Sequence, residues 1–111
     1  MALPFSPSLS KNGFVFISGQ VHLKDGQLLE GSIEEQTHQI MQNLQALLEK
    51  EGVTFNDVVK VTIYTTDMSL YERVNEVYVS YFSEKLPARE MVGVKELPLG
   101  ARLEISMIAA K

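Results

Sequence analysis

The chain has 111 residues, of which 45% are hydrophobic, and its formal net charge is −4. This length predicts a single domain over residues 1–111 that buries roughly two-thirds of its unfolded surface. No apolar run approaches the ~20 residues of a transmembrane helix, and the lack of cysteine excludes disulfides and thiolate ligands. The basic residues are scattered along the chain, which disfavours nucleic acid as a partner. The first residues do not resemble a signal peptide, and the lack of cysteine fits a cytoplasmic location, which is expected.

The N-terminal third of the sequence predicts two strands joined by a tight turn. Residues 1–11 are rich in Pro and Ser, which suits an edge strand or an extended arm. Asn12-Gly13 is a strong signal for a hairpin turn, and a strand is expected from Phe14 to about Gln20. Within it, Gly19 marks a bulge, a close approach of a ligand to the backbone, or simply the end of the strand. Residues 21–31 are expected to form a loop.

Two amphipathic helices flank a central strand in the middle of the chain. Ser32-Ile33-Glu34-Glu35 has the pattern of a capping box and opens the first helix, which Gly52 is expected to end. A strand follows at about 57–66. A second capping-box pattern, Ser69-Leu70-Tyr71-Glu72, predicts a helix that ends before Pro87. The apolar stripes of both helices are expected in the core: Ile33, Ile40, Met41, Leu44, Leu47 and Leu48, then Leu70, Val74, Val77, Tyr78, Tyr81 and Phe82.

The C-terminal part predicts two strands, about 88–95 and 101–109, separated by Pro98 and Gly100. The second strand alternates, so Glu104 lies on the face opposite the apolar residues. In the first strand, Arg89 and Met91 share the less apolar face. If the more apolar faces pack under the helices, Arg89 and Glu104 both point from the opposite face of the sheet.

This pair of charges has two interpretations. The first is a cross-strand ion pair that contributes little energy. The second is a site for a small carboxylate, in which Arg89 is a bidentate clamp and Glu104 handles water. The sequence shows no metal or cofactor motif, because His22 and His38 have no ligand-spaced partners and Ser18 lacks the pattern of a nucleophile elbow. Simple hydrolysis therefore remains open.

The order of elements is β-β-α-β-α-β-β, which predicts an α+β fold. Two helices can cover only one face of such a sheet. The other face is half apolar, and in a chain this small such a face is usually buried by self-association. A homo-oligomer is therefore expected.

Several motifs resemble those of the Rid family, the reactive intermediate deaminases that are also called YjgF or L-PSP proteins. The main ones are Pro87-Ala88-Arg89 and Leu103-Glu104-Ile105. Ile17-Ser18-Gly19-Gln20, Asp57-Val58-Val59-Lys60-Val61-Thr62 and Val74-Asn75 also match, in the right order and at the right spacings, so the resemblance covers nearly the whole chain.

The resemblance implies a chorismate-mutase-like fold with a mixed sheet, two helices on one face, and a homotrimer with clefts between subunits. Family members of the deaminase type hydrolyse 2-imino or enamino acids to 2-keto acids and ammonia without a cofactor. By the same resemblance, Arg89 would bind the substrate carboxylate and Glu104 would act as the acid/base that positions water. Gly19 would offer backbone hydrogen bonds, and Ser18 and Asn75 would line or support the cleft.

Three residues depart from the family pattern. Phe5 stands where the deaminase archetype has a tyrosine, Glu90 replaces a small residue, and Met91 replaces a frequent cysteine. Phe5 and Glu90 favour an alternative function, a trimer that binds keto or amino acids without catalysis, whereas Arg89 with Glu104 favours the enzyme. A third family label, endoribonuclease or translation inhibitor, is disfavoured by the acidic charge balance and the lack of a catalytic histidine pair.

Overall fold

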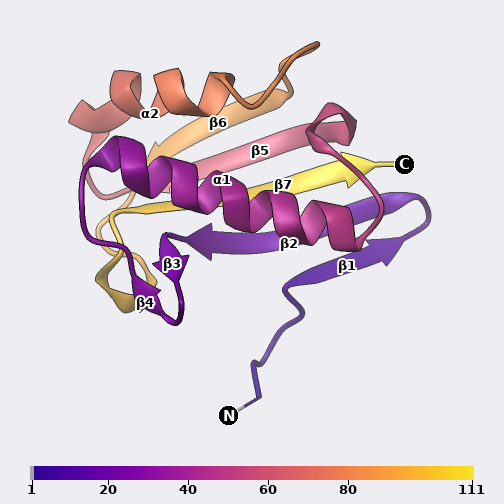
Figure 1. The fold of residues 1–111 in the computed structure, drawn as a ribbon, viewed down its shortest axis with the longest axis horizontal. Helices are drawn as coiled ribbons and strands as arrows, with labels where there is room; N and C mark the ends of the chain where they lie inside the picture. Colours follow the sequence, from indigo (N-terminus) through magenta and orange to yellow (C-terminus); the bar gives the residue numbers. More distant parts are fainter. Residues whose placement is uncertain (1) are drawn as a thin grey trace.

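A five-stranded mixed sheet carries two α-helices on one of its faces (Figure 1). The strands are β1 (Ser8–Lys11), β2 (Phe14–Val21), β5 (Val58–Thr65), β6 (Ala88–Gly93) and β7 (Leu103–Ala110), and the helices are α1 (Ile33–Lys50) and α2 (Tyr71–Val79). The computed structural model describes residues 2–111. The strand order is β1-β2-β7-β5-β6, and only β5 and β6 pair in parallel. The predicted α+β fold is confirmed, and the order β-β-α-β-α-β-β holds for the five-stranded sheet and its two helices. Within residues 2–111, no helix has the length and apolar character that crossing a membrane requires.

The predicted hairpin turn joins β1 to β2. Asn12 and Gly13 have φ angles of 53° and 82°, so both are left-handed, as a type I′ turn requires. Asparagine and glycine adopt this conformation at the lowest cost, which is why the dipeptide is a reliable signal. The turn places β1 at the edge of the sheet, as its Pro- and Ser-rich sequence predicts.

Helix α1 begins at the predicted capping box. The Ser32 hydroxyl accepts a hydrogen bond from the Glu35 amide, and the Glu35 carboxylate accepts one from the Ser32 amide, both at 3.0 Å. The helix ends before Gly52, whose φ of 80° allows the chain to turn away. The predicted stripe packs on the sheet and includes the fully buried residues Ile33, Ile40, Met41, Leu44 and Leu48.

Ser32→Ala is expected to lower the free energy of unfolding by about 1 kcal/mol, because an orphan amide at the start of α1 loses its acceptor. The measurement is the denaturant midpoint at a fixed protein concentration. Ser32→Asp keeps an acceptor at the same position and should retain the parent midpoint. A Ser32→Ala midpoint equal to that of the parent would contradict the contribution of this cap.

The expectation of a loop over residues 21–31 is wrong. The segment contains a second, two-stranded sheet of β3 (Leu23–Lys24) and β4 (Gln27–Leu28). Asp25 and Gly26, with φ angles of 52° and 84°, form its turn. Strands of two residues are too short to show alternation in a sequence, so only the Asp-Gly turn signal was available.

The second predicted capping box is also wrong. Asp67, not Ser69, supplies the cap: its Oδ1 accepts hydrogen bonds from the Ser69 amide at 2.9 Å and the Ser69 hydroxyl at 2.7 Å. These bonds begin a single 3-10 turn over Met68–Leu70, and α2 follows directly without a side-chain cap. A carboxylate two residues upstream therefore outcompetes the serine for the free amides.

The assignment of faces on β6 is wrong as well. Parallel pairing with β5 sets Arg89 beside Val61 and Met91 beside Ile63. Val61 and Ile63 are fully buried on the helix side, so Arg89 and Met91 lie on that side too. Because β6 is an edge strand beneath α2, this side can accommodate an arginine, and the apolar Val92 is left on the open face.

The faces of β7 agree with the prediction. Leu103 and Ile105 are fully buried under the helices, and Glu104 lies between them in sequence on the open face. Arg89 and Glu104 therefore point from opposite faces of the sheet. The expectation that they share one face is wrong, and so is the cross-strand ion pair within one protomer.

Candidate active site

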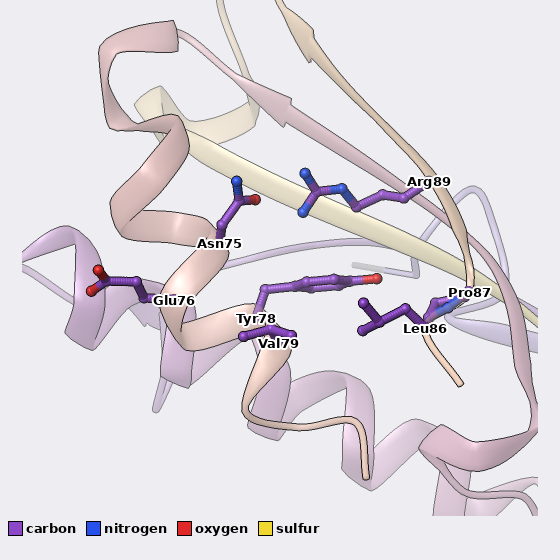
Figure 2. Close-up of a pocket in the computed structure, with 7 residues that line it drawn as sticks. All are labelled: Asn75, Glu76, Tyr78, Val79, Leu86, Pro87 and Arg89. Atoms are coloured by element: carbon purple, nitrogen blue, oxygen red, sulfur yellow. The ribbon is translucent and has the colours of Figure 1, made fainter. Parts of the chain in front are cut away.

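The candidate site residues fall into two pockets of similar size. The Arg89 pocket has a volume of about 480 Å³, and the Glu104 pocket has a volume of about 500 Å³. The first lies between α2 and the start of β6, and it is lined by Asn75, Glu76, Tyr78, Val79, Leu86, Pro87 and Arg89 (Figure 2). The second lies beside β2 and β7, and Phe5, Ser18, Gly19 and Glu104 are among its lining residues.

Aromatic rings from α2 position the Arg89 side chain. The guanidinium carbon lies 4.9 Å from the centre of the Tyr78 ring and 5.6 Å from that of Tyr71. Arg89 Nη2 also donates a long, 3.5 Å hydrogen bond to the Tyr71 hydroxyl. Figure 2 shows the guanidinium extended over Tyr78 toward Asn75. Within residues 2–111 no carboxylate forms an ion pair with Arg89, so its donors are available to an anionic ligand.

Two buried polar atoms beside Arg89 lack partners within the described chain. They are the Tyr78 hydroxyl and Asn75 Oδ1. Burial raises the pKa of Tyr78 to about 12, against a smaller opposing effect of Arg89, so the hydroxyl is neutral. A buried polar atom without a partner is costly, and a bound ligand or water is the usual remedy.

A bulge in β2 brings the backbone against the Glu104 carboxyl group. The pairing of β2 with β7 shifts register between Ile17 and Gln20, and a Cβ atom on Gly19 would lie 2.7 Å from Glu104 Cδ. Of the interpretations of Gly19, the bulge is therefore confirmed, and the strand end is wrong because β2 continues to Val21. Burial raises the pKa of Glu104, which brings it closer to the range useful for proton transfer near neutral pH.

Gly19→Ala is expected to displace Glu104 and to lower the free energy of unfolding by about 1–3 kcal/mol, because its Cβ would overlap the carboxyl carbon. The measurement is again the denaturant midpoint. Gly93→Ala is a matched control with a smaller expected effect, since its Cβ would approach its nearest neighbour, Met68 Cγ, only to 3.1 Å. A Gly19→Ala protein as stable as the parent would show that this close approach is not restrictive.

Of the remaining candidate residues, Ser18 and Phe5 lie at the Glu104 pocket and Met91 lies elsewhere. The Ser18 hydroxyl donates to the Ser6 carbonyl at 2.7 Å, and the Ser18 amide donates to the Pro7 carbonyl at 2.9 Å. These bonds hold the N-terminal arm, and with it the exposed Phe5, beside the Glu104 pocket. Met91 lines neither pocket; it packs against the core.

Glu90 is not a competitor for Arg89. It lies on the open face, where its carboxylate forms a 2.8 Å ion pair with Lys60. Because Arg89 lies on the helix side, the two neighbouring charges point away from each other.

Two supporting residues were missed in the sequence. Tyr71 and Tyr78 are seven residues apart, a spacing that places both rings on one face of α2. That spacing could have indicated a platform for the arginine of the neighbouring strand. Across residues 2–111 no cluster of three potential metal ligands is found.

Known proteins resemble this chain over almost its whole length. The sequence model of the family described as endoribonuclease L-PSP matches residues 1–111. A RutC family protein from Pyrococcus horikoshii is 43% identical over 110 residues, which cover 97% of this chain and 87% of that protein. A mouse protein named 2-iminobutanoate/2-iminopropanoate deaminase is 41% identical over 110 residues, with coverage of 97% and 82%.

Solved structures have the same fold. YyfA of Yersinia pestis, described as a member of the Rid family, aligns with a TM-score of 0.96 at 38% identity and covers 100% of this chain and 90% of its own. Escherichia coli TdcF, solved with bound serine, aligns with a TM-score of 0.93 at 28% identity, with coverage of 100% and 91%. The likeness therefore extends over both pockets.

Proposed function

The chain belongs to the endoribonuclease L-PSP family, which includes the Rid proteins, and on that premise we propose that it hydrolyses 2-imino or enamino acids to 2-keto acids and ammonia. The observation that carries the proposal is the chemistry of the two pockets. One holds a guanidinium that has no acidic partner within residues 2–111, and the other holds a partly buried carboxyl group beside a backbone bulge. A carboxylate clamp and an acid/base are what this hydrolysis requires.

In the proposed mechanism, Arg89 binds the substrate carboxylate through two parallel hydrogen bonds and presents the C=N carbon to water. Glu104 takes a proton from the attacking water and delivers a proton to the imine nitrogen. Glu104 then moves the hydroxyl proton of the resulting carbinolamine to its amino group, the C–N bond breaks to release ammonia, and the keto acid remains. One water molecule is consumed for each ammonia released.

We place the reaction between subunits, because Arg89 and Glu104 lie on opposite faces of the sheet in one protomer. The Arg89 pocket of one subunit would face the Glu104 pocket of its neighbour in a homotrimer. The open face supports this association, since Phe14 and Phe16 leave 46% and 44% of their surface exposed there and Val92 is also exposed.

We expect the protein to be a trimer with a mass near three times 12.4 kDa, because that association would bury the apolar part of the open face. Light scattering at micromolar concentration measures this mass. A monomer under these conditions would remove the intersubunit site together with the trimer.

The second candidate function is binding of a keto or amino acid without catalysis. It is supported by the serine bound to TdcF and by Phe5, which cannot supply the hydroxyl group of the archetypal tyrosine. RNA cleavage, the activity in the family's description, is less well supported, because the net charge is −4 and the basic residues do not cluster.

A coupled assay distinguishes the enzyme from the binder. A threonine dehydratase generates 2-iminobutanoate, semicarbazide traps the imine, and the trapped product is followed over time. If the protein is a deaminase, it suppresses trapping and accelerates release of 2-oxobutanoate. Unchanged trapping at an excess of protein would reject the enzymatic proposal and favour the binder.

A further inference from the structure

Apolar side chains from three separate segments form the walls of the Glu104 pocket. Leu3 and Phe5 come from the N-terminal arm, Leu23 from β3, and Pro98 and Leu99 from the turn that precedes β7. In the single protomer its volume is about 500 Å³, which is larger than the smallest 2-imino acids need.

Much of the pocket's side-chain hydrogen-bonding capacity is already used within the protomer. The Ser18 hydroxyl donates to Ser6, and the Gln20 amide donates to the Ser18 carbonyl at 3.0 Å. Within residues 2–111 the Glu104 carboxyl group accepts no such bond, and it is reserved for the reacting atoms in the proposed mechanism. A polar substituent on the ligand would therefore lose its hydrogen bonds to water in this pocket and gain few from the protein.

Leu99 has an unusual backbone conformation at the rim of this pocket. Its φ of 63° and ψ of 12° place it in the left-handed region, where a leucine is strained. Its side chain is nevertheless 70% exposed in the protomer, so core packing does not compensate for the strain. Strained residues that the core does not require tend to occur at binding sites.

From these observations we infer that the Glu104 pocket holds the side chain of the ligand and selects branched or aromatic apolar side chains, with Leu99 as a specificity-determining residue. The inference rests on the proposed function and narrows its substrate class. Phe5 fits the same assignment, because it presents a ring without a hydroxyl group to the pocket.

Calorimetric titration of the assembled protein tests the inference with two keto acids, 4-methyl-2-oxopentanoate and 2-oxobutanoate. The parent protein is expected to bind the longer, branched acid at least ~10-fold more tightly. One or two additional methylene groups in an apolar pocket typically change the affinity by this factor. Leu99→Ala should reduce this preference to within about threefold. Leu99→Met keeps the apolar volume and should retain the preference.

Equal binding of the two acids by the parent, no binding of either, or a preference unchanged in Leu99→Ala would overturn the inference. Keto-acid binding requires no turnover, so this result is independent of the semicarbazide assay. Imine hydrolysis without a preference for apolar side chains would reject the specificity and leave the proposed function standing. A preference for the branched keto acid without imine hydrolysis would support the specificity and reject the proposed function.

Discussion

Arg89→Ala is expected to weaken binding of a 2-keto acid by roughly thirtyfold or more. The variant leaves the ligand carboxylate without its charge-assisted hydrogen bonds, and truncation of such a partly buried pair typically costs about 2–5 kcal/mol. The full effect is expected because Arg89 has no ion-pair partner within residues 2–111 that already uses its donors. Titration calorimetry of parent and variant with 2-oxobutanoate measures the change.

Two other arginine variants make this experiment specific. Arg73→Ala removes an exposed arginine from the same region, one that forms two 2.8 Å hydrogen bonds with Glu34 outside the pocket, and it should bind as the parent does. Arg89→Lys keeps the charge but not the planar fork, so its affinity should fall between those of the parent and Arg89→Ala. If Arg89→Ala binds keto acids as tightly as the parent, Arg89 is not the clamp.

Glu104→Gln is expected to lower turnover by about a hundredfold or more while ligand binding changes by only a few fold. The amide keeps the shape of the side chain and most of its hydrogen bonding but cannot accept a proton. The semicarbazide assay gives turnover, and calorimetry gives binding.

The pH dependence provides a second readout for Glu104. Burial raises the pKa of this carboxyl group, and the deprotonated form is the base. Parent turnover should therefore decrease as the pH is lowered through the raised pKa, and Glu104→Gln should lack that decrease. Glu90→Gln is the control on the same face, where Glu90 pairs with Lys60, and it should keep parent turnover. Full turnover in Glu104→Gln would exclude Glu104 as the acid/base.

The sequence predicted the elements that depend on local interactions. The Asn12-Gly13 turn, the capping box at Ser32 and the end of α1 before Gly52 each involve residues within a few positions of one another. The face of Arg89 could not be predicted in this way. It is set by the parallel register between β6 and β5, which joins segments about thirty residues apart, and the count of apolar residues on β6 favoured the wrong side.

The same distinction between local and long-range interactions applies to the candidate site. The sequence motifs identified Arg89, Glu104, Gly19 and Asn75 as separate site candidates. In the structure each of these residues lines one of the two pockets. Their division between two pockets follows from the topology of the sheet and has no local signal. The strained conformation of Leu99 has none either, since leucine rarely adopts a left-handed backbone and nothing nearby in the sequence predicts it.

The division of Arg89 and Glu104 between opposite faces has a genetic consequence if the clefts form between subunits. A chain that lacks Arg89 still carries an intact Glu104 pocket, and a chain that lacks Glu104 still carries an intact Arg89 pocket. When the two defective chains assemble together, one cleft of each mixed trimer is intact. It combines Arg89 from the chain that lacks Glu104 with Glu104 from the chain that lacks Arg89. Two inactive alleles of this gene would then complement each other, whereas two alleles that damage the same pocket would not.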